Sequence, residues 1–259
     1  FNEPLTSSDK ISDFIIKSLN NIKAKNIYNE IVNNIYNFKC IEIKTYQEMC
    51  NYLNQGYTII LIENEKNALA LETKGNLGRS INIPDTEATL RGAKDAFVED
   101  IQRNIGLIRK RIKNNNLRID NLKLGKYTNT QIDIVYLNDV CPKELINQIK
   151  EKISKIETNG LINSEQLKNL LDKKNFFPLP TIMTTERPDL ASNAIINGKV
   201  VIIVDNSPYA LIIPGLLNDY FKTSEDFYSK NINVTITRIL RYIAFFIAIM
   251  APAIYLTLI

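Results

Sequence analysis

The stretch NQGYTIILIENEKNALAL, residues 54–71, returns as INGKVVIIVDNSPYALII at residues 196–213, with each position displaced by 142. Gly56 corresponds to Gly198, and the apolar run at 59–62 corresponds to the run at 201–204. Each copy has an apolar run of strand length, a turn rich in Asn and acidic residues, and a second apolar run. Continuous apolar runs are typical of strands that are covered on both faces. The repeat therefore predicts two related β-hairpins.

The resemblance between the copies extends upstream of the hairpins. A stretch with helical character precedes each one, TYQEMCNYL at 45–53 and ERPDLASNAII at 186–196, and Pro188 suits a first helical turn. Residues 1–19 also resemble residues 136–153. The strand QIDIVYL at 131–137 has no counterpart before Phe1, so we expect the chain to begin inside a longer protein.

These repeats predict an α/β fold made of two related lobes with mixed sheets. We place the first lobe at residues 1–73, without its first strand, and the second at residues 117–230. Residues 74–116 form a linker with a long amphipathic helix that joins the lobes. Its apolar stripe recurs at helical spacing, at Phe97, Ile101, Ile105, Ile108 and Ile112.

The positive charge of the chain is concentrated in this central helix. Residues 91–118 contain eight basic and three acidic residues, a larger positive balance than the +4 of the whole chain. Such a cluster is typical of a face that binds nucleic acid, anionic lipid headgroups or a neighbouring subunit, or of a solvated face with internal ion pairs. Nucleic acid is disfavoured because no aromatic residues alternate with the basic ones.

The last eighteen residues, 242–259, carry no charge and are mostly Ile, Ala, Phe and Leu. This length is sufficient for a helix that crosses a membrane, and we predict one over residues 235–259. Arg238, Arg241 and Tyr242 mark its boundary, and the positive-inside rule places the lobes on the cytoplasmic side. The alternatives are a buried helix of a soluble core and a tail anchor.

The sequence does not favour an enzyme. The chain has no His, which excludes a His general base, a Ser-His-Asp triad and a His-containing zinc site. Its nine Gly form neither a Walker loop nor a GxGxxG motif. We therefore predict no catalytic residue, no cofactor and no metal site. The stretch TTERPD, residues 184–189, suits a helix N-terminus that either binds an anion or is simply capped.

Two segments resemble the A subunits of GerA-type spore germination receptors. The first is SINIPDTEATLRGAKDAFVEDIQRNIGLIRKRIKNNNLRI, residues 80–119, although Ala93 and Ala96 stand where that family commonly has Pro and Gly. The second is FFPLPTIMTTERPDLASNAIINGKVVIIVDNSPYALIIPGLLNDYFKTSEDFY, residues 176–228. Together the segments identify the chain as similar to this family over nearly its whole length.

The resemblance implies a membrane subunit of a germinant receptor that acts in nutrient-triggered germination as part of an oligomeric ion channel. This region would be the assembly and gating domain on the cytoplasmic (spore core) side of the spore inner membrane. The implied partners are a transporter-like B subunit, a lipoprotein C subunit and further copies of the chain. Alternatives are a bilobed domain that senses a small molecule between its lobes, a channel subunit of the SpoVA-associated paralogues, and a scaffold unrelated to germination.

Three sets of candidate site residues follow from the two segments and the boundary of the apolar tail. We expect the subunit or lobe contacts to involve Arg91, Gly92, Phe97, Glu99, Asn104, Arg109 and Arg111. The second motif consists of Thr185, Glu186, Arg187 and Pro188, and the membrane boundary consists of Arg238, Arg241 and Tyr242.

Overall fold

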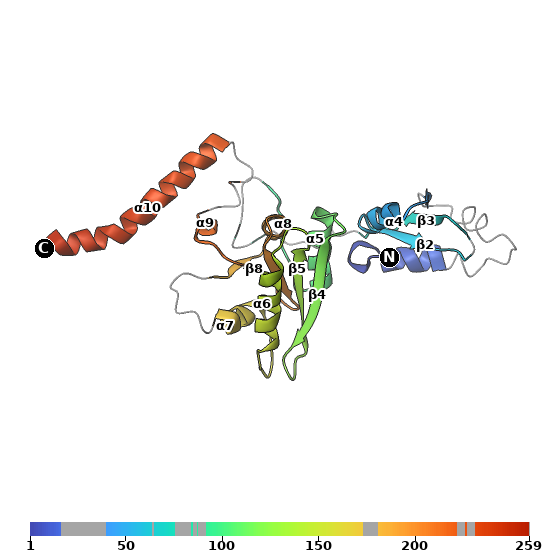
Figure 1. The fold of residues 1–259 in the computed structure, drawn as a ribbon, viewed down its shortest axis with the longest axis horizontal. Helices are drawn as coiled ribbons and strands as arrows, with labels where there is room; N and C mark the ends of the chain where they lie inside the picture. Colours follow the sequence, from blue (N-terminus) through green and yellow to red (C-terminus); the bar gives the residue numbers. More distant parts are fainter. Residues whose placement is uncertain are drawn as a thin grey trace.

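The computed structural model shows two α/β domains and a long C-terminal helix (Figure 1). It describes residues 1–16, 40–63, 65–75, 84, 87, 92–172, 181–221, 226 and 231–258. All six pairings between described strands are antiparallel, whereas the sequence led us to expect mixed sheets. Three of these pairings are hairpins, whose strands must run in opposite directions because a short turn joins them.

The first domain is a three-stranded sheet in the order β1-β3-β2 with a helical segment on each face. Ile11 and Ile15 pack against Leu69 and Leu71 on one face, and Met49 and Tyr52 of α4 pack on the other. The alternation along β3 directs its side chains to both faces. The elements are η1 (Glu3–Leu5), α1 (Ser8–Lys10), η2 (Ile11–Ile16), β1 (Cys40–Ile43), α4 (Tyr46–Leu53), β2 (Tyr57–Ile60) and β3 (Ala68–Glu72).

The second domain is a five-stranded sheet in the order β4-β5-β7-β8-β6, again between two helical layers. One face packs against α5 and α8, and the other packs against α6 and α7. The elements are α5 (Ile101–Arg111), β4 (Leu117–Leu124), β5 (Thr130–Leu137), α6 (Lys143–Ser154), α7 (Ser164–Asp172), β6 (Met183–Thr185), α8 (Pro188–Ile196), β7 (Val200–Val204) and β8 (Ala210–Ile213).

The sequence repeat is also a repeat of structure. The unit β1-α4-β2-β3 corresponds to β6-α8-β7-β8, and the strand registers agree at the displacement of 142. Ile43 pairs with Ala68 as Thr185 pairs with Ala210, and Thr58 pairs with Leu71 as Val200 pairs with Ile213. Gly56 and Gly198 both have positive φ, +83° and +79°, which explains why both copies have Gly before the second strand.

The central helix α5 is shorter than the apolar stripe led us to expect. It begins after Asp100, whose carboxylate accepts hydrogen bonds from the backbone N–H groups of Gln102 and Arg103. Phe97 precedes this cap in a segment without regular secondary structure. The apolar stripe lies in the core of the second domain, against α8 and the sheet, and α5 also lies beside η1 of the first domain. The helix therefore belongs to the second domain and contacts the first.

The C-terminal helix α10 (Asn231–Leu258) extends away from both domains (Figure 1). Its segment Val234–Thr257 has a mean hydropathy of 2.0, and none of its most apolar window is buried in the molecule. By length and composition this helix is able to cross a membrane. Within the described residues, this helix is therefore not part of the core of either domain, contrary to the alternative of a buried helix.

Candidate functional site

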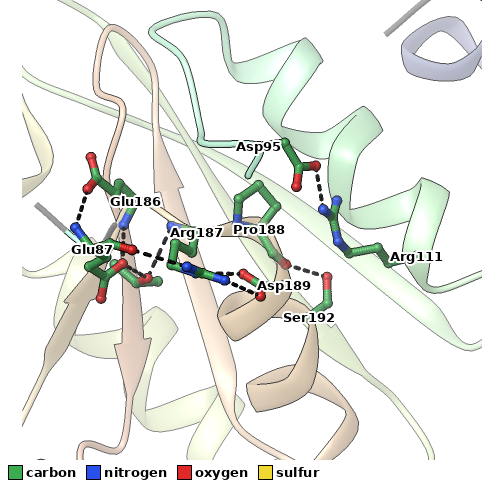
Figure 2. Close-up of polar contacts among 9 residues, drawn as sticks. Glu87, Asp95, Arg111, Glu186, Arg187, Pro188, Asp189 and Ser192 are labelled. Atoms are coloured by element: carbon green, nitrogen blue, oxygen red, sulfur yellow. Dashed lines mark hydrogen bonds and ion pairs between the residues drawn. The ribbon is translucent and has the colours of Figure 1, made fainter. Parts of the chain in front are cut away.

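A buried charged cluster lies where β6 ends and α8 begins (Figure 2). Arg187 is fully buried, and its Nε and Nη2 atoms donate to the two carboxylate oxygens of Asp189 at 3.0 and 2.7 Å. A buried guanidinium requires such a bidentate partner, because an unpaired charge in the interior is very unfavourable. Pro188 begins the helix, as expected from the sequence, and its carbonyl accepts a hydrogen bond from Ser192 at 2.7 Å.

The cluster holds Glu87, a residue about a hundred positions earlier in the chain. Thr185 Oγ1 donates to Glu87 Oε2 at 2.6 Å, and the backbone N–H of Glu186 donates to the same oxygen at 3.2 Å. In return, the N–H of Glu87 donates to Glu186 Oε1 at 2.9 Å, and Arg187 Nη1 donates to the Glu87 carbonyl at 3.1 Å. Burial raises the pKa of Glu87, although the hydrogen bonds from Thr185 and Glu186 oppose this rise.

The two segments that carried the family resemblance therefore meet at this cluster. The second contact between them is a backbone hydrogen bond of 2.7 Å from the N–H of Phe97 to the carbonyl of Glu186. The Phe97 ring is buried in the core between α5 and the sheet. Thr185, Glu186 and Arg187 thus bind the segment that leads into α5, and Pro188 begins α8 beside them.

The other residues of the first set occupy different environments. Asn104 is fully buried and connects α5 to the segment that precedes it. Its side chain forms hydrogen bonds with the N–H and the carbonyl of Val98 at 2.8 and 2.5 Å. Glu99 has an exposed side chain, and its carbonyl accepts from the N–H of Asn206 at 2.9 Å. Gly92 is exposed with φ of +125°, and Arg91 lies outside the described residues.

The two arginines at the end of α5 differ in their partners. Arg111 forms an ion pair with Asp95 and donates to the carbonyl of Leu107 at 2.9 Å (Figure 2). The buried Nε of Arg109, by contrast, has no hydrogen-bond partner within the described structure. Burial lowers the pKa of the Arg109 guanidinium. Arg109 is therefore the residue of this set with an unused donor.

A second cluster joins the end of the second domain to α10. Asp226, whose side chain is 6% exposed, pairs with Arg241 at 3.0 Å and with Arg238 at 3.4 Å. Arg241 also donates to the carbonyl of Phe221 at 2.8 Å, and the Tyr242 hydroxyl donates to Asn218 Oδ1 at 2.6 Å. All three predicted boundary residues thus contact the domain at the point where the uncharged run begins.

Sequence reasoning missed Glu87, Asp189 and Asp226 as site residues. All three stand inside the two quoted segments, so the signal was present in the family resemblance. The carboxylates of the Thr185–Asp189 cluster are held by internal hydrogen bonds, an arrangement that fixes one chain segment against another. A separate open hollow of about 800 Å³ lies at the tip of the β4–β5 hairpin, bordered by Lys123, Lys126 and the end of α6.

The comparisons with known proteins agree on one family. Residues 1–259 match the family model described as Bacillus/Clostridium GerA spore germination protein. The chain is 35% identical over 212 residues to spore germination protein KA of Bacillus subtilis (strain 168), covering 82% of this chain and 39% of that protein. It is 31% identical over 217 residues to spore germination protein B1 of the same organism, covering 84% of this chain and 45% of that protein.

The chain thus spans less than half the length of these two relatives. Its fold is similar to the crystal structure of the N-terminal domain of the A subunit of the Bacillus megaterium spore germinant receptor GerK3. The TM-score is 0.61 at 22% identity, and the match covers 82% of this chain and 79% of that one. On the whole-chain family match and the identity to these relatives, the chain belongs to the GerA family of spore germination proteins.

Proposed function

We propose that this chain is the cytoplasmic assembly and gating region of a membrane subunit that acts in nutrient-triggered germination as part of an oligomeric ion channel. It works in the spore inner membrane with a transporter-like B subunit, a lipoprotein C subunit and further copies of itself. Its role is mechanical and not enzymatic. Membership of the GerA family and the apolar helix α10 support this proposal.

The observation that carries the proposal is the contact between Asp226 and α10. A nearly buried carboxylate binds Arg238 and Arg241 immediately before the uncharged run, so a movement of the second domain must move or tilt α10. A hydrogen bond to a charged group contributes about 1.5–3 kcal/mol, which is enough to couple two conformations. By the positive-inside rule, the two arginines also support a cytoplasmic position for the domain.

Spores that carry Asp226→Asn in the full-length protein test this coupling. We expect slower release of monovalent cations after nutrient addition, because the neutral amide holds the two arginines less strongly. Glu151→Gln is the matched control, since it neutralises a carboxylate of α6 in an exposed ion pair with Lys155, the residue after the helix. Wild-type germination of Asp226→Asn, at equal protein levels by immunoblot, contradicts the proposal.

Assembly through α5 is the second part of the proposal. Arg109 is partly exposed near the end of α5, so its guanidinium suits a carbonyl or carboxylate of a neighbouring subunit. Arg109→Gln should therefore reduce co-purification of the other subunits with the full-length protein. The neighbouring Lys110 is exposed on the same helix, so Lys110→Gln removes one charge without removing a buried donor. Equal co-purification of both variants contradicts an assembly role for Arg109.

Ligand sensing is a second candidate, and the hollow at the β4–β5 hairpin favours it. A volume of about 800 Å³ is within the range of small-molecule sites. This hollow lies within the second domain, whereas the sequence suggested a cleft between the lobes. A germinant amino acid or sugar at a hundredfold excess over Kd adds about 2.7 kcal/mol to the free energy of unfolding, which a melting experiment detects. An unchanged melting temperature with every germinant tested contradicts this candidate.

A further inference from the structure

The short helix α9 (Leu217–Tyr220) directs the charged side chain of Asp219 inward and leaves its apolar side chains exposed. Leu216, Leu217 and Tyr220 are 52%, 46% and 43% exposed. Asp219 forms an ion pair with Lys199 in which the two side chains are only 11% and 14% exposed, and it accepts from the N–H of Leu216 at 3.1 Å. A helical turn that faces water normally has the opposite distribution.

The position of α9 explains this reversal. Phe221, the residue after α9, packs against the Tyr242 ring with centroids 4.2 Å apart and meets the Phe245 ring edge-to-face with centroids 5.2 Å apart. Asn218 of α9 accepts the Tyr242 hydroxyl proton at 2.6 Å. Tyr242 is the first residue of the uncharged run, and Phe245 lies one helical turn further along α10. The outward side chains of α9 are therefore level with the point where α10 becomes fully apolar.

We propose that Leu216, Leu217 and Tyr220, the α9 foot, rest in the headgroup region of the bilayer that α10 crosses. Partly exposed Leu and Tyr side chains suit this zone, because a Tyr ring places its apolar body among the acyl chains and its hydroxyl in water. The inward ion pair keeps the charge of Asp219 away from the lipid. The continuity of the foot with α10 through Phe221 and Tyr242 favours lipid over a protein partner.

This inference rests on the proposed membrane crossing of α10, and one experiment separates the two claims. The chain contains no Trp, so a single introduced Trp is its only indole fluorophore. Tyr220→Trp places the probe on the foot, with Leu217→Trp as a second probe. Phe246→Trp, at a position that is 64% exposed on α10, reports membrane insertion. Tyr127→Trp, at a position that is 77% exposed between β4 and β5, is the water-facing control.

Each variant of the 259-residue chain is reconstituted in vesicles of phosphatidylcholine that is brominated at the headgroup end of its acyl chains. We expect the lipid bromines to quench the indole emission from positions 217, 220 and 246, and to leave the emission from position 127 unchanged. The indole emission from position 220 should also shift to shorter wavelength than the emission from position 127. Circular dichroism of each variant verifies its fold.

Other outcomes overturn the inference in distinguishable ways. Quenching at position 246 without quenching at 217 or 220 rejects the α9 foot and leaves the crossing of α10 intact. Absence of quenching at all positions rejects both claims. Protection of position 220 from aqueous iodide without lipid quenching means that protein covers the foot. Equal quenching at position 127 means that the whole domain adsorbs to lipid, which also rejects a specific foot.

Discussion

The two copies of the strand–helix–hairpin unit have the same strand register, but different kinds of contact stabilise the N-terminus of the helix in each copy. In the first copy, α4 begins with a capping box, in which Glu48 donates its backbone N–H to Thr45 Oγ1 at 3.2 Å and accepts the Thr45 N–H at 3.3 Å. In the second copy, the position equivalent to Thr45 is Arg187, which is fully buried and paired with Asp189. The cap of α4 is exposed and involves only residues close in sequence, whereas the start of α8 is buried and depends on tertiary contacts.

This difference shows that the two copies share a backbone arrangement but that the second copy also binds a distant segment of the chain. The helix α4 has no fully buried residue, and its cap involves only neighbours in sequence. The helix α8 has a buried face, and its first turn receives Glu87 and the segment that leads into α5. The second copy therefore organises the chain between the domains, and the following predictions test that asymmetry.

Replacement of Arg187 should have the largest effect. Arg187→Ala leaves Asp189 without its buried partner and removes a donor to Glu87, so we expect the free energy of unfolding to fall by about 3–5 kcal/mol. Urea denaturation of the chain in detergent micelles measures this change. A loss below about 1 kcal/mol, the size of an ordinary cap, would mean that the buried cluster is no stronger than the first copy's cap.

The equivalent glycines should differ in a way that the geometry predicts. Positive φ alone costs a side chain about 1–2 kcal/mol at either position. An added Cβ at Gly56 would lie 2.8 Å from the carbonyl oxygen of Leu5, whereas at Gly198 it would lie 3.2 Å from that of Val140. We expect Gly56→Ala to destabilise more than Gly198→Ala in the same denaturation assay. The reverse order contradicts the close contact between η1 and the start of β2.

Loss of the local cap should have a smaller effect. Thr45→Ala removes the side-chain acceptor for the N–H of Glu48, which typically costs about 1 kcal/mol. Since α4 is largely exposed, the loss should appear as faster hydrogen exchange in α4. Exchange in α8 should remain unchanged, because its first turn does not depend on this residue. Equally faster exchange in α8 contradicts the independence of the two copies.

The smallest expected effect is a difference in pH dependence. Burial raises the pKa of Glu87, so its contribution to stability is fully present below the ordinary carboxyl pKa of about 4.3 and is lost as pH rises through the raised value. Backbone hydrogen bonds from Lys44 and Thr45 lower the pKa of Glu48, so its contribution is present above the ordinary pKa and is lost in acid.

Melting temperatures measured from acidic pH, below the ordinary carboxyl pKa of about 4.3, to neutral pH test these opposite signs. Wild type should lose more stability towards neutral pH than Glu87→Gln, because glutamine does not titrate. Burial also raises the pKa of Asp133, so both proteins should still lose some stability as the pH rises. Glu48→Gln should instead reduce the loss of stability in acid. Identical profiles for wild type and Glu87→Gln contradict the burial of a titrating carboxyl at this position.

The repeat allowed the hairpins, both helices and the start of α8 at Pro188 to be predicted, because apolar runs, turn residues and Pro act locally. The length of α5 was overestimated for the same reason. Phe97 continues the helical spacing of Ile101 and Ile105, but the helix begins only after the Asp100 cap, which lies between Phe97 and Ile101. A spacing of four does not distinguish a helical turn from an irregular segment whose side chain enters the same core.

The partners of Arg187 and Asp226 were beyond local reasoning. Glu87 and Arg187 are a hundred positions apart, and only the folded chain shows that they meet. The sequence placed Arg238 and Arg241 at a membrane boundary but contained no sign that one carboxylate binds both. Long-range pairing of charges is set by the arrangement of the domains, which propensity and periodicity do not encode.

A charge exchange between Asp226 and Arg241 tests most directly whether the second domain controls α10. Asp226→Arg and Arg241→Asp are introduced singly and together in the full-length protein, and cation release is followed after nutrient addition. The account predicts that each single variant germinates slowly and that the double variant recovers a clear part of the wild-type rate, because the opposite charges again face each other. A double variant as slow as the worse single variant, at equal protein level, would contradict it.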